Sequence, residues 1–226
     1  MGVKSLKNES AEAPVEGTAV ASPARRAWRG ALPDRSAQFE LKRQVVLRTA
    51  ARTFSRRGFH QTTLADIAEE LHIAKPTLYH YFRSKDEILL EIQQVAIAQI
   101  TEFVPEPSSA DTSGQEQLKT FVRRYVEMII DDFGTCLIMT GVMPLQPENQ
   151  AIVRRGSKRI EMMMREILGR GAADNSIAPC DPKLTAMLLF GALNWLPYWY
   201  RADGEIHPDD LVERIVDFML ARVGRA

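Results

Sequence analysis

Apolar residues recur every three or four positions along most of this chain, which is the spacing of amphipathic helices. Val46, Ala50 and Phe54 follow this spacing, with Arg and Lys on the opposite face. They predict a helix that begins near Ser36 and ends at Gly58. The sequence has no strand-type alternation, so the pattern predicts an all-α protein.

Two short helices and a longer one are predicted to follow. A capping box at Thr63–Asp66 begins the first, whose apolar face consists of Leu64, Ile67, Ala68 and Leu71. A tight turn at 72–74 leads to the second, which extends from Lys75 to Phe82. A full capping box at Ser84–Glu87 then begins a long fourth helix.

The rest of the chain is also predicted to be helical. The expected helices cover residues 117–133, 136–143, 147–171, 182–200 with a kink at Pro197, and a last one from Pro208. Residues 1–35 have no apolar periodicity, and their composition is typical of a disordered tail. The arginines of this tail are interpreted either as an arm that contacts DNA phosphates or as part of a solvated linker.

Charge is unevenly distributed, although the net charge of the 226 residues is zero. Residues 36–85 contain nine Lys and Arg against four Asp and Glu, whereas residues 86–226 contain fourteen against twenty-one. A small basic module joined to a larger acidic one is typical of a protein that docks on nucleic-acid phosphates with one part only. Chance clustering on solvated helix faces would give the same counts.

The sequence argues against several other classes of protein. No apolar run reaches eighteen residues and the N-terminus lacks a signal-peptide core, so a cytoplasmic protein without a membrane partner is expected. Cys136 and Cys180 make neither a disulfide framework nor a metal site. The sequence has no phosphate-binding glycine loop, metal-ligand cluster or nucleophile elbow, so neither an enzyme nor a cofactor is predicted.

The two short helices and their turn have the geometry of a helix-turn-helix, whose second helix enters the major groove of DNA. In that helix Leu78 and Phe82 are placed to face the core, and the outward side chains are Lys75, Thr77, Tyr79 and His80. These residue types supply hydrogen-bonding groups for base edges and an apolar surface for thymine methyl groups. Thr63 and Lys85 lie at helix N-termini, where backbone amides favour phosphate.

The segment from Val46 to Ile88 resembles the N-terminal signature of the TetR (tetracycline-repressor-like) family. The matching pieces are Ala50-Ala51, Phe54, Gly58-Phe59, Thr63, Ile67-Ala68, Thr77-Leu78-Tyr79, Phe82 and Ser84-Lys85. The resemblance implies a helix-turn-helix DNA-binding domain over residues 36–84 and a helical ligand-binding and dimerisation domain over residues 85–226. It also implies that DNA is contacted by Thr63, Lys75, Pro76, Thr77, Tyr79, His80 and Lys85.

This chain departs from the family pattern at two positions. His72 stands where the family usually has glycine, and we expect a positive φ there at a cost of about 1 kcal/mol. Ala74 stands where the family often has serine, so the reading helix loses an N-cap hydroxyl worth about 0.5–2 kcal/mol. Both changes affect how rigidly the reading helix is presented, and neither threatens the fold.

The resemblance further implies a repressor that binds an inverted-repeat operator as a homodimer, because two reading helices about one turn apart recognise two half-sites. In the family the last two long helices of each subunit form the dimer interface. The residues assigned to this interface, or to the core beneath it, are Leu184, Leu188, Gly191, Ala192, Trp195, Leu211, Ile215 and Phe218.

A small-molecule effector is expected to bind among the helices after the DNA-binding domain and to release the operator. Flexible methionines and aromatic rings suit an apolar ligand, and the residues assigned to this site are Met128, Met139, Met162, Trp195, Tyr198, Trp199 and Arg201. Ordinary core packing is the alternative for each methionine.

Residues 194–204 are similar to a segment of TetR members that sense coenzyme A thioesters. This similarity implies an acyl-CoA effector, with its phosphates near Arg201 and the basic residues of 154–159. A hydrophobic drug or a free fatty acid is the alternative effector, and a DNA-binding regulator that needs no ligand is the alternative function.

Overall fold

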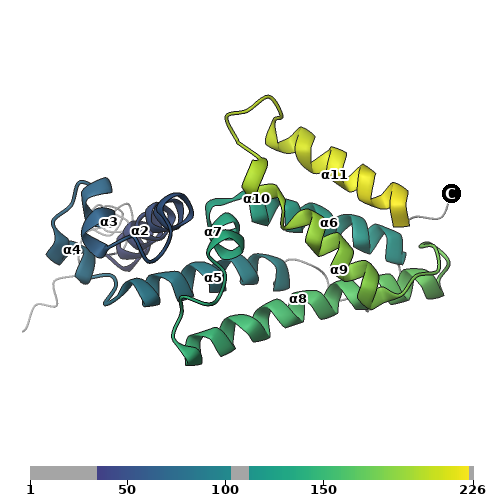
Figure 1. Cartoon of the computed structure of the whole chain (residues 1–226), viewed down its shortest axis with the longest axis horizontal. Coiled ribbons are helices and arrows are strands. Elements are labelled where there is room, and N and C mark those ends of the chain that lie inside the picture. Colours follow the sequence, from purple (N-terminus) through teal and green to yellow (C-terminus); the bar gives the residue numbers. More distant parts are fainter. Residues whose placement is uncertain (1–34, 103–111, 224–226) are drawn as a thin grey trace, which may run out of the picture. The chain divides into compact units, whose positions relative to one another are not determined.

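The computed structural model describes residues 35–102 and 112–223, and within them the chain is helical apart from turns and short loops. These ranges contain no strand, and the predicted all-α class is confirmed. Nearly all of the predicted tail, residues 1–34, lies outside the described residues. Figure 1 shows the helices, which are α2 (Arg35–Arg57), α3 (Leu64–Glu70), α4 (Lys75–Tyr79), α5 (Lys85–Thr101), α6 (Gly114–Ile130), α7 (Asp132–Thr140), α8 (Pro147–Ala173), α9 (Pro182–Leu193), α10 (Leu196–Trp199) and α11 (Pro208–Val223).

The chain is divided into two compact units, Met1–Glu40 and Leu41–Ala226. Of the first unit only residues 35–40 are described, and they form the beginning of α2. Within the second unit we call residues 41–84 the head and residues 85–223 the body. None of the described helices is long and apolar enough to cross a membrane.

The head packs its helices around a small apolar core. Leu47 and Phe54 of α2, Ile67 of α3 and Leu78 of α4 are almost completely buried, and Phe82 joins them from the segment after α4. Leu78 and Phe82 are four residues apart and therefore point to the same side. The inner side of α4 is thus anchored, and its other residues face outward.

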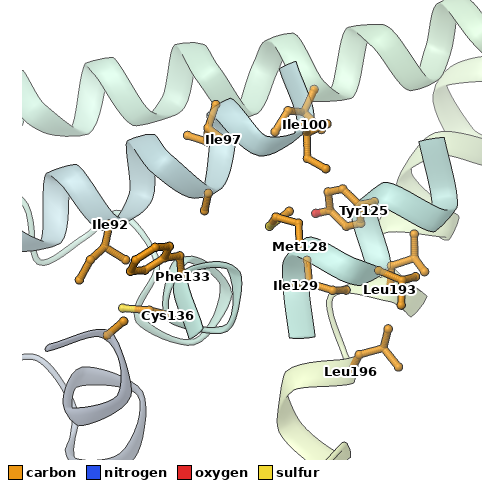
Figure 2. Packing of buried hydrophobic residues seen from close by; sticks show 14 of the residues in the cluster. Ile92, Ile97, Ile100, Tyr125, Met128, Ile129, Phe133, Cys136, Leu193 and Leu196 are labelled. Atoms are coloured by element: carbon orange, nitrogen blue, oxygen red, sulfur yellow. The ribbon is translucent and has the colours of Figure 1, made fainter. Parts of the chain in front are cut away.

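The body helices pack against one another along much of their length. α8 is the longest described helix and contacts α5, α6 and α9, while α6 also contacts α11. Figure 2 shows side chains of this core, among them Ile97 and Ile100 from α5, Tyr125 and Met128 from α6, and Leu193 from α9. The same apolar cluster continues into the head core.

Sequence signals account for the starts of α3 and α5. At α3 the Thr63 hydroxyl accepts a hydrogen bond from the Asp66 N–H, and the Asp66 carboxylate accepts one from the Thr63 N–H at 2.7 Å, which confirms this capping box. At α5 the Ser84 hydroxyl accepts from the Glu87 N–H at 3.1 Å. The Glu87 carboxylate, however, accepts from the Arg83 N–H at 2.7 Å, so the predicted second box is only half formed.

The boundary between α6 and α7 differs from the prediction of one helix to residue 133. α6 ends at Ile130 because Asp131 adopts an extended conformation, with φ −74° and ψ 159°. The Asp131 carboxylate then caps the next helix by accepting a hydrogen bond from the Phe133 N–H at 3.3 Å. α7 therefore begins at Asp132, four residues before the predicted start at Cys136.

The helix predicted over residues 182–200 is two helices in the structure. α9 ends at Leu193, and the short α10 begins at Leu196. Pro197 lies in the first turn of α10, where its missing N–H costs no helical hydrogen bond. The break therefore precedes the proline, and the predicted kink at Pro197 is corrected to an interruption at residues 194–195.

Candidate DNA-reading surface and ligand chamber

α4 presents the predicted DNA-reading side chains on one short stretch of surface. The exposed residues are Lys75, Pro76, Thr77, Tyr79 and His80. Tyr79 has 47% of its surface exposed, and the Lys75 ammonium lies 5.9 Å from the centroid of its ring. α4 ends at Tyr79 rather than at the predicted Phe82, although the Phe82 N–H still donates to the Leu78 carbonyl at 3.1 Å.

The turn before α4 has the geometry that the sequence predicts. His72 has a φ of 53°, a left-handed conformation that is uncommon outside glycine. Its N–H donates to the Glu69 carbonyl at 2.9 Å, and the Ile73 N–H donates to the Ala68 carbonyl at 3.0 Å. Ala74, at the N-cap of α4, makes no side-chain hydrogen bond to the helix. α4 is therefore held by backbone bonds and by Leu78, without a polar cap.

Thr63, a predicted phosphate-binding residue, already bonds to its own helix. Its hydroxyl lies 2.8 Å from an Asp66 carboxylate oxygen, in addition to the two backbone bonds of the capping box. The hydrogen bonds from the Thr63 N–H and hydroxyl lower the pKa of Asp66. The Thr63 side chain remains exposed at the head surface.

Lys85, the other predicted phosphate-binding residue, is half-buried and ties the head to the start of α5. Its ammonium donates to the carbonyls of Phe59 at 2.9 Å and Thr62 at 3.1 Å, and lies 4.4 Å from the centroid of the Phe59 ring. An ammonium has three donors, so one is left for a phosphate. Sequence reasoning missed this structural role, because the two partners lie 26 and 23 residues away along the chain.

A chamber of about 890 Å³ lies among the body helices, within the usual size range of small-molecule sites. Its lining comes from α6 to α10 and from the segments between them. Apolar side chains dominate, among them Met128 of α6, Ile138 of α7, Val153 and Ile160 of α8, and Phe190 of α9. The chamber is thus assembled from helices that are far apart in sequence.

The structure brings three of the seven predicted ligand-binding residues to this chamber. They are Met128, Trp195 and Tyr198, and the two rings stack with their centroids 4.9 Å apart. The other four are not among its lining residues: Met139, Met162, Trp199 and Arg201. The Arg201 guanidinium donates to the Tyr200 carbonyl at 3.1 Å.

Charged side chains of the lining all come from α8. Glu161 is paired with Lys158 at 2.5 Å and with Arg165 at 3.0 Å, and these hydrogen bonds lower its pKa. Arg154 has no carboxylate within 4 Å among the residues that the structure describes; its guanidinium lies 3.5 Å from the Gln150 side-chain oxygen. Among the described residues, the charge of Arg154 is therefore not balanced by an ion pair, and this side of the chamber is positively charged.

A second hollow of about 440 Å³ is contiguous with the chamber through shared residues. Arg154 and Lys158 line both. The second hollow adds Arg155, Arg159, Met162, Met163 and Glu166, all from α8. An apolar chamber therefore adjoins a surface with four basic side chains.

Ion pairs join the head to Asp131, which separates α6 from α7, and to Asp132, the first residue of α7. The Arg48 guanidinium lies 2.9 Å from Asp131 and 3.5 Å from Asp132, and the Arg52 Nε lies 2.9 Å from Asp132. Arg48 also lies 4.8 Å from the centroid of the Phe133 ring. We call Arg48, Arg52, Asp131 and Asp132 the clasp. Both helices that flank its acidic residues line the chamber, so the clasp connects the chamber wall to α2.

Large apolar side chains are exposed on α9 and α11. Leu184, Leu188 and Phe218 each have more than half of their surface exposed, at 58%, 66% and 56%. Gly191 and Ala192 are exposed beside them, and Ile215 is half-buried. Leu211 is only 3% exposed and belongs to the core. Exposed apolar residues gathered on two helices are typical of an interaction surface.

Comparison with known families identifies the chain. A family model described as bacterial regulatory proteins, tetR family, matches residues 46–92. A second model, described as tetracyclin repressor-like, C-terminal domain, matches residues 111–223. The chain belongs to the TetR family. It is therefore a transcriptional regulator with a DNA-binding helix-turn-helix, and not an enzyme.

Individual proteins similar to this TetR-family chain agree with that assignment. It is 25% identical over 179 residues to the transcriptional activator FasR of Mycolicibacterium smegmatis, covering 78% of this chain and 80% of FasR. The crystal structure of the TetR-family regulator PfmR of Thermus thermophilus matches with a TM-score of 0.69 and 28% identity, over 78% of this chain and 97% of PfmR. AibR, solved in complex with isovaleryl coenzyme A and operator DNA, shares the fold, with a TM-score of 0.67 at 21% identity over 78% of this chain and 96% of AibR.

Proposed function

We propose that this protein is a ligand-responsive repressor, which binds an inverted-repeat operator as a homodimer and leaves it when an effector fills the chamber. The observation that carries the proposal is the clasp, because it ties the wall of an apolar chamber to α2 of the DNA-binding head. A ligand that displaces α6 or α7 then changes the position of the head. Such a ligand shifts the population away from the conformation that fits two successive grooves.

Operator contacts are made by the exposed side of α4 and by the helix starts beside it. Lys75 and His80 supply donors for base edges, while Thr77 and Tyr79 supply apolar surface for thymine methyl groups. The full set is Thr63, Lys75, Pro76, Thr77, Tyr79, His80 and Lys85. The DNA-binding domain then covers residues 36–84, and the ligand-binding and dimerisation domain covers residues 85–226.

The homodimer forms through α9 and α11. Leu184, Leu188 and Phe218 each expose more than half of their surface, and a second copy of the chain would bury them. Nothing lies within 4 Å of the place where a side chain on Gly191 would begin, so this part of α9 leaves room for a close helix approach. Ala192 and Ile215 complete the interface, with Leu211 in the core beneath.

The effector is an acyl-CoA thioester. Its acyl chain suits the apolar chamber, and its phosphates suit the adjoining basic surface of Arg154, Arg155, Lys158 and Arg159. The fold that this chain shares with AibR accommodates both isovaleryl coenzyme A and operator DNA in that protein. A free fatty acid or a hydrophobic drug would use the chamber but leave the basic surface unoccupied.

Selection of genomic fragments by the purified protein at moderate salt, followed by sequencing, tests this function. We expect enrichment of a short inverted repeat, and loss of the bound fragments when decanoyl-CoA is added. The Tyr79→Ala variant is the matched control and should enrich no sequence. If the protein binds fragments without a preferred sequence and releases them as the salt concentration rises, this result would contradict specific operator binding. Enrichment that decanoyl-CoA, decanoic acid and decanol all leave unchanged would favour a regulator without a ligand.

Activation instead of repression is a second candidate, favoured by the similarity to the activator FasR. The two alternatives share the operator and the effector, and they differ in where the operator lies relative to the promoter. Transcription in vitro from an enriched promoter separates them. Fewer transcripts on addition of the protein support a repressor, and more transcripts support an activator.

A further inference from the structure

A partly buried polar pair lies at the wall of the mainly apolar chamber. The Tyr125 hydroxyl donates a hydrogen bond to the side-chain oxygen of Asn194 at 2.7 Å. Tyr125 is only 5% exposed, and its ring contacts Phe121 and Phe190, at centroid distances of 6.0 and 5.1 Å. Figure 2 shows Tyr125 among the apolar side chains Met128, Ile129 and Leu193 of the core. The pair joins α6 to the end of α9.

This arrangement leaves the amide nitrogen of Asn194 without a hydrogen bond to the part of the chain that the structure describes. Because the side-chain oxygen accepts from Tyr125, the nitrogen carries two donors, and neither makes a hydrogen bond to any residue that the structure describes. Asn194 is half-buried and lines the chamber. The other side chains of the lining with hydrogen-bonding groups are Arg154, Ser157, Lys158 and Glu161 of α8, together with Tyr125, Trp195 and Tyr198. Among the lining donors away from α8, Trp195 and Tyr198 are 61% and 46% exposed, whereas the half-buried Asn194 amide is held in place by its hydrogen bond from Tyr125.

An amide N–H that faces a ligand chamber selects for a hydrogen-bond acceptor. When a purely hydrocarbon segment fills the chamber, the N–H loses its water and gains no partner, which costs roughly 5- to 150-fold in affinity. A carbonyl oxygen placed at the same point accepts the hydrogen bond and avoids that loss. Tyr125 holds the amide oxygen, which leaves the amide nitrogen of this chamber-lining residue to donate to a ligand, so the two residues act together.

We propose that Asn194, positioned by Tyr125, recognises the carbonyl oxygen of the effector, which in an acyl-CoA is the oxygen of the thioester. This inference rests on the proposed function and deepens it, because it assigns the specificity of the chamber to one hydrogen bond. The basic surface of α8 binds the anionic part of the ligand, and Asn194 binds the carbonyl group at which the acyl chain begins. A compound with the same chain and the same phosphates but without the carbonyl is then a poor effector.

Two probes that differ only in this group test the proposal. Decanoyl-CoA has a thioester carbonyl, and S-decyl-CoA has a methylene in its place. Isothermal titration of the full-length protein should show tighter binding of decanoyl-CoA, by about tenfold or more. Asn194→Leu, which is similar in size, should remove this preference by weakening decanoyl-CoA binding alone. Tyr125→Phe should reduce the preference without removing it, because the amide keeps its donors but loses its fixed orientation.

Arg154→Met is the matched control, because it lies on the basic surface and should weaken both probes equally. A merely structural role of Asn194 would also weaken both probes equally, so the ratio between the probes separates the two roles. Equal binding of the two probes by the wild-type protein, which needs no variant to fold, would overturn the proposal. So would an unchanged preference in a folded Asn194→Leu or Asn194→Ala variant.

Failure of the wild-type protein to bind either probe would overturn the carbonyl proposal together with the acyl-CoA effector. Operator enrichment by the same preparation would then still support a DNA-binding regulator. The two failures are therefore distinguishable, since one concerns the ratio of the probes and the other concerns DNA binding.

Discussion

The proposed DNA-reading surface and the proposed ligand chamber are built in opposite ways. The reading surface consists of neighbours in the sequence, residues 75–80, whose backbone is fixed by one turn and by the buried Leu78. The chamber collects its lining from Tyr125 to Tyr198 across several helices. A surface made by one turn depends on individual side chains, whereas a chamber made by several helices depends on how those helices are placed. Single substitutions should therefore act sharply in the head and more gradually in the body.

Tyr79→Ala is expected to have the largest effect, because it removes an exposed aromatic contact from both half-sites of the operator. Each lost base contact costs about 1–3 kcal/mol, so two half-sites lose about 2–6 kcal/mol of binding free energy. Fluorescence anisotropy with the enriched inverted repeat measures this loss. Thermal melting should stay unchanged, since the Tyr79 side chain is half exposed.

Gln44→Ala, at an exposed position of α2 outside the reading surface, is the control for Tyr79→Ala. It should bind the operator as the wild-type protein does. Wild-type affinity in Tyr79→Ala itself would remove this side chain from the reading surface.

Lys85→Met tests the contact between the head and the start of α5 in the body. The substitution removes two charge-assisted hydrogen bonds to backbone carbonyls of the head, and we expect a loss of about 2 kcal/mol in the free energy of unfolding. In a chain of this length that corresponds to a melting temperature lower by roughly 4–8 °C. Lys75→Met is the matched control, since Lys75 is exposed and should affect DNA affinity without lowering the melting temperature. Equal melting temperatures for the two variants would mean that Lys85 serves phosphate binding alone.

Asp132→Asn tests whether the clasp transmits the ligand signal. Its pairs with Arg48 and Arg52 are partly exposed, and such pairs contribute about 0–1 kcal/mol to stability, so folding should change little. The concentration of decanoyl-CoA that releases half of the operator should rise several-fold. With weaker ion pairs, a displacement of the chamber wall is transmitted less strongly to α2. Glu127→Gln, which removes an ion pair within α6 only, is the control. The same shift in both variants would show that the clasp has no special role in coupling.

Local patterns in the sequence were sufficient where the structure is local. The capping box at Thr63, the positive φ of His72 and the outward side of α4 all follow from residues within a few positions of one another. The partners of Lys85 and the clasp were not predictable, because they join residues 23 to 84 positions apart. For the same reason the sequence could identify methionines suited to a chamber but could not decide that Met128 lines it while Met139 does not.

Asp66→Asn is expected to have the smallest effect, and it acts on a local feature of the head through pH. Hydrogen bonds from the Thr63 N–H and hydroxyl lower the pKa of Asp66 below its unfolded value. A carboxyl group with a lowered pKa stabilises the folded state above the unfolded pKa, near 4, and this contribution is lost as the pH falls through the folded pKa. Asparagine mimics the protonated side chain, so the variant should melt below the wild-type protein at neutral pH and converge with it as the pH falls below about 4. Paired melting curves between pH 3 and 7 measure the gap, and the difference between the two proteins cancels the titration of all other carboxyl groups. A gap that is constant over this range would mean that the ionised carboxylate contributes nothing to the start of α3, and that the capping box depends on shape alone.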